Sequence, residues 1–304
     1  MSSLEKILMI AIAGGSGYVG RYLAEALSVR NDILILDRCA PDFPLGGNIR
    51  FVETDLAEED PSEYMAGVDT VLHLAAESDV RRTESSYHDT YLTTRSIVDA
   101  MGVCGIGRLL FFSSSAVYGS NGWDADEDTE CVPASEYARD KIRSESLILG
   151  TEGIQSAVLR FSNICGGAVR HGVVYDFCRK LERDPSYLEV LGNGRQTKEF
   201  LHIRDCIRAV EHTLDAGLEG VFNIGNGDPV SVNDVASEVI SAMGLRDVNV
   251  SATGGETGWE GDVARCRLDS SRFSSTGWKP SAGSLEAVRD AVRECTSIDG
   301  RGAN

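Results

Sequence analysis

The sequence has little positive charge and no long apolar run. Of its 304 residues, 29 are Lys or Arg and 47 are Asp or Glu, so the formal net charge is −18 at pH 7. The basic residues form no stripe, which argues against nucleic acid as a partner. No run reaches the roughly 18–20 apolar residues that a membrane span requires. We therefore predict a chain that binds neither nucleic acid nor membranes.

Paired cysteine motifs are also absent. The eight cysteines are scattered singly and form no CxxC. Disulfide frameworks belong to small secreted chains, and zinc sites need closely spaced ligands. We predict reduced thiols in a cytoplasmic protein without a metal site. The apolar stretch KILMIAIAGG near the N-terminus is short and closed by glycines, which is typical of a buried strand rather than a signal peptide.

Apolar, strand-like runs alternate with helical patterns along much of the chain. These runs lie at 7–13, 32–37, 49–55, 69–76, 108–115 and 156–164. They are continuously apolar, which is typical of a parallel sheet covered by helices on both faces. The pattern predicts an α/β fold with a doubly wound parallel sheet and a smaller C-terminal α/β domain. We expect the first domain over 1–165, with 195–215 returning to it, and the second over 166–304.

A glycine-rich segment, AGGSGYVG, follows the first predicted strand and opens a helical pattern. Gly14, Gly17 and Gly20 have the spacing that permits a tight turn, close approach of the backbone to a pyrophosphate, and close helix–strand packing. The second predicted strand ends at Asp37, where an acid can bind the adenosine ribose hydroxyls. This pattern predicts a Rossmann-type domain that binds NAD. Asp37 would repel the 2′-phosphate of NADP, and Arg38 beside it weakens that preference.

Tyr137 and Lys141 are four residues apart in a long helical pattern at 135–150, so they share one face of the helix. A free phenol has a pKa near 10 and is a poor base at neutral pH. A nearby ammonium and a positive nicotinamide ring would stabilise the phenolate and lower that pKa. Together with the hydroxyls of SSSAVYG at 113–119, the pair predicts proton exchange with a substrate hydroxyl.

These motifs together resemble the extended short-chain dehydrogenase/reductases, specifically the NAD-dependent nucleotide-sugar epimerases and dehydratases of the UDP-glucose 4-epimerase type. The resemblance extends over nearly the whole chain. It is carried by GGSGYVG, DILILD, TDL, HLAAES, SSSAVYG, YARDK, RFSNICG, GNGRQTKEFLHIRD, FNIGNG and the RCRLD…GWKP tail. It implies a nucleoside-diphosphate sugar as partner, with a UDP-sugar favoured, and a homodimer formed through helices near 84–102 and 135–150.

The resemblance also implies roles for individual residues. Ser114 would bind the sugar near O4 and assist Tyr137, with Lys141 as the third catalytic residue. Lys198 stands where the family carries an Arg, so the charge is kept but the bidentate fork is lost. The implied cofactor-binding residues are Gly14, Gly17, Tyr18, Val19, Asp37, Arg38, Asp55, Leu56, Leu74, Ala75, Ala76, Tyr137 and Lys141. The implied substrate-binding residues are Glu77, Ser114, Ser115, Asn163, Lys198 and Arg265.

The resemblance finally bears on the reaction. Dehydratases of this family place Asp-Glu directly after the catalytic hydroxyl, where this chain has Ser115 and Ala116. Elimination needs a base for carbon and an acid for the leaving hydroxyl, so we predict a 4-epimerase that inverts C4 through a transient 4-keto sugar. A dehydratase with unusual acids, Glu77 among them, stays open, as does a ketoreductase. A non-catalytic NAD-sensing protein is a further alternative.

Overall fold

The computed structural model describes residues 7–76, 84–259 and 261–299. The chain divides into two compact units, each built from several segments. The sequence predicts that 195–215 returns to the first domain. In the structure, Arg160–His212 belong to unit 2, and the chain returns to unit 1 at Thr213. Unit 1 consists of Met1–Ser113, Glu136–Leu159 and Thr213–Val221, and unit 2 of Ser114–Ser135, Arg160–His212 and Phe222–Asn304.

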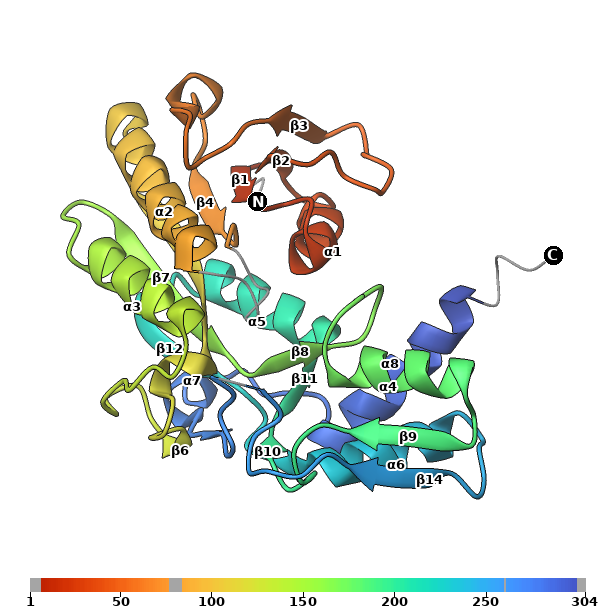
Figure 1. The fold of residues 1–304 in the computed structure, drawn as a ribbon. Helices are drawn as coiled ribbons and strands as arrows, with labels where there is room; N and C mark the ends of the chain where they lie inside the picture. Colours follow the sequence, from red (N-terminus) through yellow and green to blue (C-terminus); the bar gives the residue numbers. More distant parts are fainter. Residues whose placement is uncertain (1–6, 77–83, 260, 300–304) are drawn as a thin grey trace. The chain divides into compact units, whose positions relative to one another are not determined.

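A seven-stranded sheet carries the first half of the fold. Its strands are β1 (Met9–Ala13), β2 (Asp32–Asp37), β3 (Ile49–Glu53), β4 (Thr70–His73), β5 (Arg108–Ser114), β7 (Gln155–Phe161) and β12 (Gly220–Ile224). Their order is β12-β7-β5-β4-β1-β2-β3 (Figure 1). The pairs β1/β2, β1/β4, β2/β3 and β4/β5 are parallel. The order runs outward from β1 in both directions, so the predicted doubly wound α/β fold is confirmed.

The strands are buried because their sequences are apolar at consecutive positions. Four successive residues of β2, Ile33 to Leu36, are at most 1% exposed, and every residue of β4 is buried. A strand buried on both faces needs covering layers on both sides. The helices of unit 1 are α1 (Tyr18–Leu27), α2 (Glu84–Cys104), α3 (Glu136–Leu149) and the 3₁₀ turn η1 (Pro61–Tyr64).

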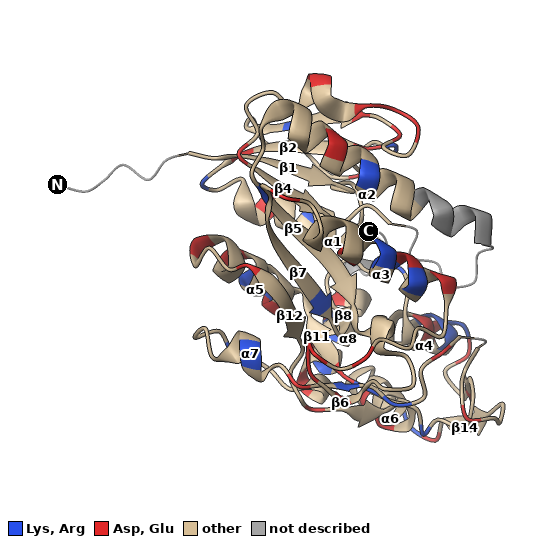
Figure 2. Cartoon of the chain, turned by 90° about the vertical axis from the view of Figure 1, so that its left-hand side faces the viewer, with Lys and Arg blue, Asp and Glu red and all other residues tan. Residues whose placement is uncertain are grey.

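Helices α2 and α3 pack side by side in unit 1 (Figure 1). Ile97 and Met101 of α2 and Ile148 of α3 join one hydrophobic cluster with Phe111 of β5. Acidic and basic residues both occur along α3 (Figure 2), and its first residue, Glu136, pairs with Arg139 at 2.5 Å. None of the helices in the described part of the chain combines the length and apolar character of a bilayer span.

Unit 2 is built from short strands and longer helices. Three helices, α4, α6 and α8, supply most of its hydrophobic core. The helices are η2 (Ser115–Tyr118), α4 (Val173–Arg183), α5 (Ile203–Asp215), α6 (Val232–Ala242), α7 (Ser271–Ser274) and α8 (Ser284–Asp299), with α5 running on into unit 1. The strands are β6 (Trp123–Ala125), β8 (Asn163–Cys165), β9 (Tyr187–Val190), β10 (Thr197–Lys198), β11 (Phe200–His202), β13 (Val230–Ser231), β14 (Asn249–Ala252) and β15 (Arg267–Leu268).

The short strands of unit 2 form two-stranded ladders, which are β10/β13, β11/β8, β14/β9 and β15/β6. The run at 156–164, predicted as one strand, is interrupted at Ser162, whose backbone nitrogen donates to Ile224 O at 2.9 Å. Beyond this residue β8 pairs in parallel with β11. A single apolar run therefore supplies strands to two different sheets.

A buried polar cluster lies at the start of unit 2. Tyr118 is fully buried, its hydroxyl donates to Asn223 Oδ1 at 2.7 Å, and Arg160 Nη1 donates to the same hydroxyl at 2.9 Å. Asn223 N in turn donates to Glu127 Oε1 at 2.8 Å. Burial raises the pKa of Tyr118 to about 12, so the phenol remains a neutral donor. Each polar group in this cluster depends on the next one.

We predict that Tyr118→Phe destabilises the protein by about 1–3 kcal/mol, because two buried polar partners lose their hydrogen bond. Tyr187→Phe is the matched control, since Tyr187 is 39% exposed, and should change stability by less than about 0.5 kcal/mol. Urea unfolding of the three proteins measures the difference. Equal midpoints for wild type and Tyr118→Phe would show that this cluster does not support the fold.

Candidate active site

The loop between β1 and α1 requires glycine at two positions. Gly14 has a φ of 82°, and a Cβ there would lie 2.6 Å from the backbone nitrogen of Ala75. A Cβ on Gly20, in the first turn of α1, would lie 2.7 Å from the Cα of Gly15. The N-cap residue Gly17 brings no capping side chain. Backbone therefore packs on backbone here, and the helix N-terminus has the form that receives a phosphate.

Asp37 ends β2 next to this loop. Its Oδ2 accepts a hydrogen bond from Ser16 N and its Oδ1 accepts one from Cys39 N, both at 3.1 Å. A carboxylate has lone pairs left after two such bonds and can accept from ribose hydroxyls. The hydroxyl of Ser16 is buried and has no partner among the described residues. Arg38 is exposed. This arrangement fits the adenosine and pyrophosphate parts of a dinucleotide.

Five other predicted cofactor residues of unit 1 lie at the start of α1 or just after β4. Tyr18 and Val19 are half-buried in α1, and Leu74, Ala75 and Ala76 are half-buried just after β4. The backbone nitrogens of Leu74 and Ala75 both donate to Ala13 O at 2.9 Å. The end of β4 is thereby fixed beside the glycine loop.

Asp55 and Leu56 follow β3. Asp55 Oδ1 accepts a hydrogen bond from Ala57 N at 3.0 Å. Leu56 is 4% exposed and belongs to the hydrophobic cluster of unit 1, so its side chain packs inward. Glu77 lies outside the described residues.

Tyr137 and Lys141 lie on one face of α3. Lys141 is 3% exposed, its Nζ donates to Phe112 O at 2.6 Å, and it lies 5.8 Å from the centroid of the Tyr137 ring. Burial lowers the pKa of Lys141 to about 8, and the nearby Glu145 partly opposes this shift. A charged Lys141 beside a half-buried phenol favours its phenolate. The sequence spacing therefore does bring these two side chains together.

His73, at the end of β4, is fully buried close to the same lysine. Its Nε2 lies 2.9 Å from Thr94 Oγ1, which itself donates to Thr90 O at 2.9 Å. Thr94 has one proton to donate, so the geometry assigns the imidazole proton to Nε2. Burial and the charge of Lys141 lower the pKa of His73 to about 3. The imidazole is therefore neutral at pH 7 and adds no charge to the site.

The three serines of the predicted catalytic segment have different surroundings. Ser113 is buried in unit 1, where its hydroxyl donates to Glu145 Oε1. Ser114 ends β5, is half-buried, and accepts a hydrogen bond from Ala116 N at 3.2 Å as the N-cap of η2. Ser115 is buried in unit 2 and lies near the thiol of Cys266. Of the three, Ser114 has the most exposed side chain, which agrees with its selection by sequence spacing.

The predicted substrate residues of unit 2 gather around one short segment, β10 and the residue after it. Asn163 Nδ2 donates to Glu199 O at 3.0 Å, and Arg265 forms a β-bridge with Thr197. The guanidinium of Arg265 lies 4.0 Å from the centroid of the Trp123 ring, within the range of a cation–π contact. Strand pairing thus brings together residues about a hundred positions apart in the sequence.

Lys198 has a partner that the sequence analysis missed. Its Nζ donates to Asp262 Oδ1 at 2.7 Å and also to Val263 O. The Asp262 side chain is 2% exposed, so the lysine charge is largely balanced within unit 2. No local pattern indicates this pair, because 64 residues separate its members. Glu145 was missed as well, although its spacing of four from Lys141 was a visible signal.

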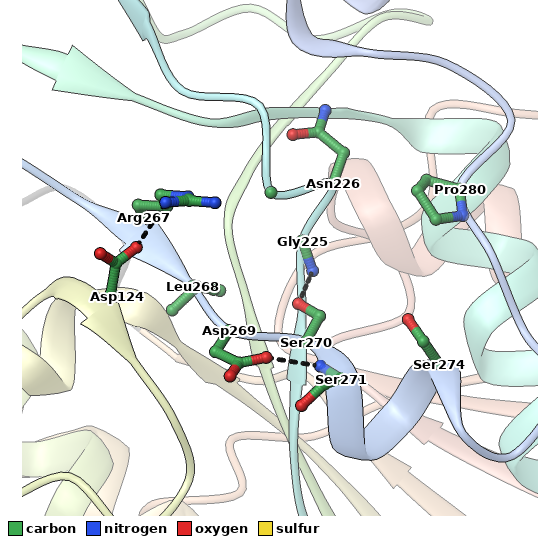
Figure 3. A pocket seen from close by; sticks show the side chains of 11 residues that line it. Asp124, Gly225, Asn226, Arg267, Leu268, Asp269, Ser270, Ser271, Ser274 and Pro280 are labelled. Atoms are coloured by element: carbon green, nitrogen blue, oxygen red, sulfur yellow. Dashed lines mark hydrogen bonds and ion pairs between the residues drawn. The ribbon is translucent and has the colours of Figure 1, made fainter.

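A pocket of about 370 Å³ in unit 2 lies apart from the predicted residues, since none of them lines it. Figure 3 shows that some of its polar groups pair with one another. Arg267 pairs with Asp124 at 2.7 Å, Gly225 N donates to Ser270 Oγ at 3.0 Å, and Ser271 N donates to an oxygen of Asp269 at 2.8 Å. These three contacts are made within the lining of the pocket itself.

Residues 10–225 match the model of the NAD dependent epimerase/dehydratase family. The chain belongs to this family. It is 30% identical over 302 residues to the "Putative UDP-glucose 4-epimerase" of Methanocaldococcus jannaschii, with 93% of this chain and 97% of that protein covered. It is also 27% identical over 272 residues to a dTDP-glucose 4,6-dehydratase of Streptomyces niveus, with 78% of each covered.

A solved structure of MoeE5 in complex with UDP-glucuronic acid and NAD is 27% identical and superimposes with a TM-score of 0.85, covering 95% of this chain and 99% of that one. The resemblance to nucleotide-sugar epimerases and dehydratases is thus confirmed. NAD is confirmed as the cofactor of this NAD-dependent family member. The glycine loop and Asp37 are the residues of this chain that fit it.

We predict that Gly20→Ala weakens NAD binding by this family member at least tenfold, because the added Cβ forces α1 away from the glycine loop. Tenfold corresponds to about 1.4 kcal/mol. Gly47→Ala is the matched control, since nothing lies within 4 Å of a Cβ at Gly47. Calorimetric titration with NAD measures both, and circular dichroism checks the fold. An unchanged dissociation constant in Gly20→Ala would show that the glycine loop does not contribute to NAD binding.

Proposed function

We propose that this chain is an NAD-dependent nucleotide-sugar 4-epimerase that inverts C4 of a UDP-sugar through a transient 4-keto sugar. The supporting observation is the composition of the turn after Ser114. Ser115 and Ala116 offer no carboxylate, and the Ser115 side chain is buried. Elimination of water needs a carbon base and an acid for the leaving oxygen. Oxidation and re-reduction at C4 need one group that takes a proton and returns it.

Tyr137 is the group proposed for that proton. Its phenolate would take the proton of the C4 hydroxyl and later return it to the opposite epimer. Lys141 stabilises the phenolate by its charge, and the Ser114 hydroxyl would bind the C4 oxygen. Bound NAD supplies the acceptance and return of a hydride. The chain's own task is to orient the sugar and hold this proton.

The residues of unit 2 are proposed to hold the nucleotide. The 4-keto sugar must rotate between the two half-reactions so that its opposite face meets the cofactor. Contacts to the sugar must therefore be few, and contacts to the diphosphate must be strong. Arg265 and Asn163 are proposed to bind the diphosphate. Lys198 is a weaker candidate, because its charge is balanced by Asp262. The solved relative with bound UDP-glucuronic acid supports a UDP-sugar as the substrate class.

A dehydratase or a ketoreductase of the same family is the alternative, and the similarity to dTDP-glucose 4,6-dehydratase supports the former. A non-catalytic NAD-sensing protein would have no need for Ser114, Tyr137 and Lys141 together. We also propose a homodimer formed through α2 and α3. We propose a cytoplasmic location as well, because the eight cysteines, all among the described residues, form no disulfide there.

We predict that Tyr137→Phe lowers kcat by about 10²–10⁴-fold, the usual contribution of a general acid–base group. NAD binding and the fold should persist, because only one hydroxyl is lost. Tyr187→Phe serves as the control and should retain full turnover. Stopped assays of the three proteins on UDP-glucose measure the effect. Full activity in Tyr137→Phe would reject its role as acid and base.

The reaction type is tested by proton NMR of product mixtures from UDP-glucose, UDP-N-acetylglucosamine and UDP-glucuronate. We expect a C4-inverted sugar from at least one of them, without net change in the cofactor. Loss of water would instead identify a dehydratase, and stoichiometric consumption of reduced cofactor would identify a ketoreductase. Either result would overturn the epimerase proposal.

A further inference from the structure

Unit 1 contains a buried carboxylate that the proposed mechanism does not use. Glu145 lies on α3, one turn after Lys141, and is 4% exposed. Residues four apart on a helix are neighbours on the same face. Carboxylates are rarely buried unless a charge or several hydrogen bonds compensate for their lost hydration. The lost hydration of the Glu145 carboxylate must therefore be compensated by groups close to it.

Two consecutive residues of β5 hold the two charged side chains. The Phe112 carbonyl accepts a hydrogen bond from Lys141 Nζ at 2.6 Å, and the Ser113 hydroxyl donates to Glu145 Oε1. Lys141 and Glu145 are thus both fixed against the same strand end, just before Ser114. The Glu145 carboxylate is therefore held in a defined position by the Ser113 hydroxyl.

Among the residues that the structure describes, Glu145 is the negative partner of Lys141. β5 contributes no titratable group here, α2 reaches the region through the uncharged Thr94, and the imidazole of β4 is neutral at pH 7. The pKa of Lys141 is lowered by burial and raised by Glu145. The titratable groups among the described residues that face Lys141 are Tyr137 and Glu145 on α3 and His73 on β4.

We propose that Glu145 is a positioning residue whose carboxylate, fixed by Ser113, holds Lys141 as an ammonium beside Tyr137. This inference deepens the proposed function and rests on it for its catalytic meaning. Without the carboxylate, a buried Lys141 would release its proton at a lower pH. The Tyr137 phenolate would then lose its cationic neighbour. The alkaline limit of the pH range in which Tyr137 transfers a proton would therefore move to lower pH.

The first test needs no substrate. The chain has five lysines, so NMR of protein labelled with ¹³C at the lysine ε-carbon, saturated with NAD, can follow Lys141 through a pH titration. Lys141→Gln identifies its signal. We expect Glu145→Gln to lower the titration midpoint by roughly one to three pH units, the usual effect of losing a close opposite charge. An unchanged midpoint would overturn the proposal.

Three further variants separate charge from structure. Ser113→Ala keeps the carboxylate charge and removes only its hydrogen bond, so its midpoint should move less than that of Glu145→Gln. Glu136→Gln removes an acid of the same helix that pairs with Arg139 instead, and should not move the midpoint. Glu145→Asp keeps the charge on a shorter side chain, so its Lys141 midpoint should lie close to that of wild type. If Glu145→Gln does not fold, Glu145→Ala takes its place, and an unchanged Lys141 midpoint in that variant would reject the inference.

The pH profile of kcat then connects the inference with turnover. In Glu145→Gln, the alkaline limb of the profile should move to lower pH by the same amount as the Lys141 midpoint. A uniform loss of kcat at every pH would indicate a merely structural role and contradict the proposal. A shifted midpoint in a protein that epimerises no sugar would reject the proposed function and leave the Lys141–Glu145 interaction established.

Discussion

The site depends on one constraint, which is the burial of the Lys141 ammonium between α3 and β5. A cation loses its hydration in the interior and remains charged only where dipoles or an opposite charge replace the water. Here a backbone carbonyl of Phe112 accepts its hydrogen bond, and Glu145 supplies the opposing charge. The resulting pKa of about 8 keeps the group charged at pH 7. The position of the Lys141 charge beside Tyr137 therefore depends on how α3 packs on β5.

Unit 1 could be predicted largely from the sequence, because its determinants are local. The apolar runs at 32–37 and 108–115 correspond to β2 and β5 within one residue, and the helical pattern at 135–150 corresponds to α3. Gly14 and Gly20 follow from a steric requirement that spacing alone expresses. The placement of Leu56 in the core was not visible, because a motif match indicates a position along the chain but not the direction of a side chain.

Unit 2 was less predictable, because its structure depends on contacts between distant residues. β6 and β15 are three and two residues long and pair across more than a hundred positions, so neither has a recognisable periodicity. The run at 156–164 reads as one strand, yet a single backbone hydrogen bond at Ser162 ends β7 and allows β8 to pair elsewhere. The Lys198–Asp262 pair has the same origin. Patterns within one segment cannot express such pairings.

The serine segment shows why a change of reaction type would need more than one substitution. Successive side chains of a strand face opposite sides, so Ser113 can bind Glu145 within unit 1 while Ser114 faces away from it. Ser115 is 8% exposed and lies near Cys266, whose pKa is raised by burial. An Asp at position 115 would bury a second anion-forming group beside that thiol, and desolvation would raise the pKa of both. The absence of a carboxylate at positions 115 and 116 therefore supports the proposal that one phenol, that of Tyr137, takes and returns one proton.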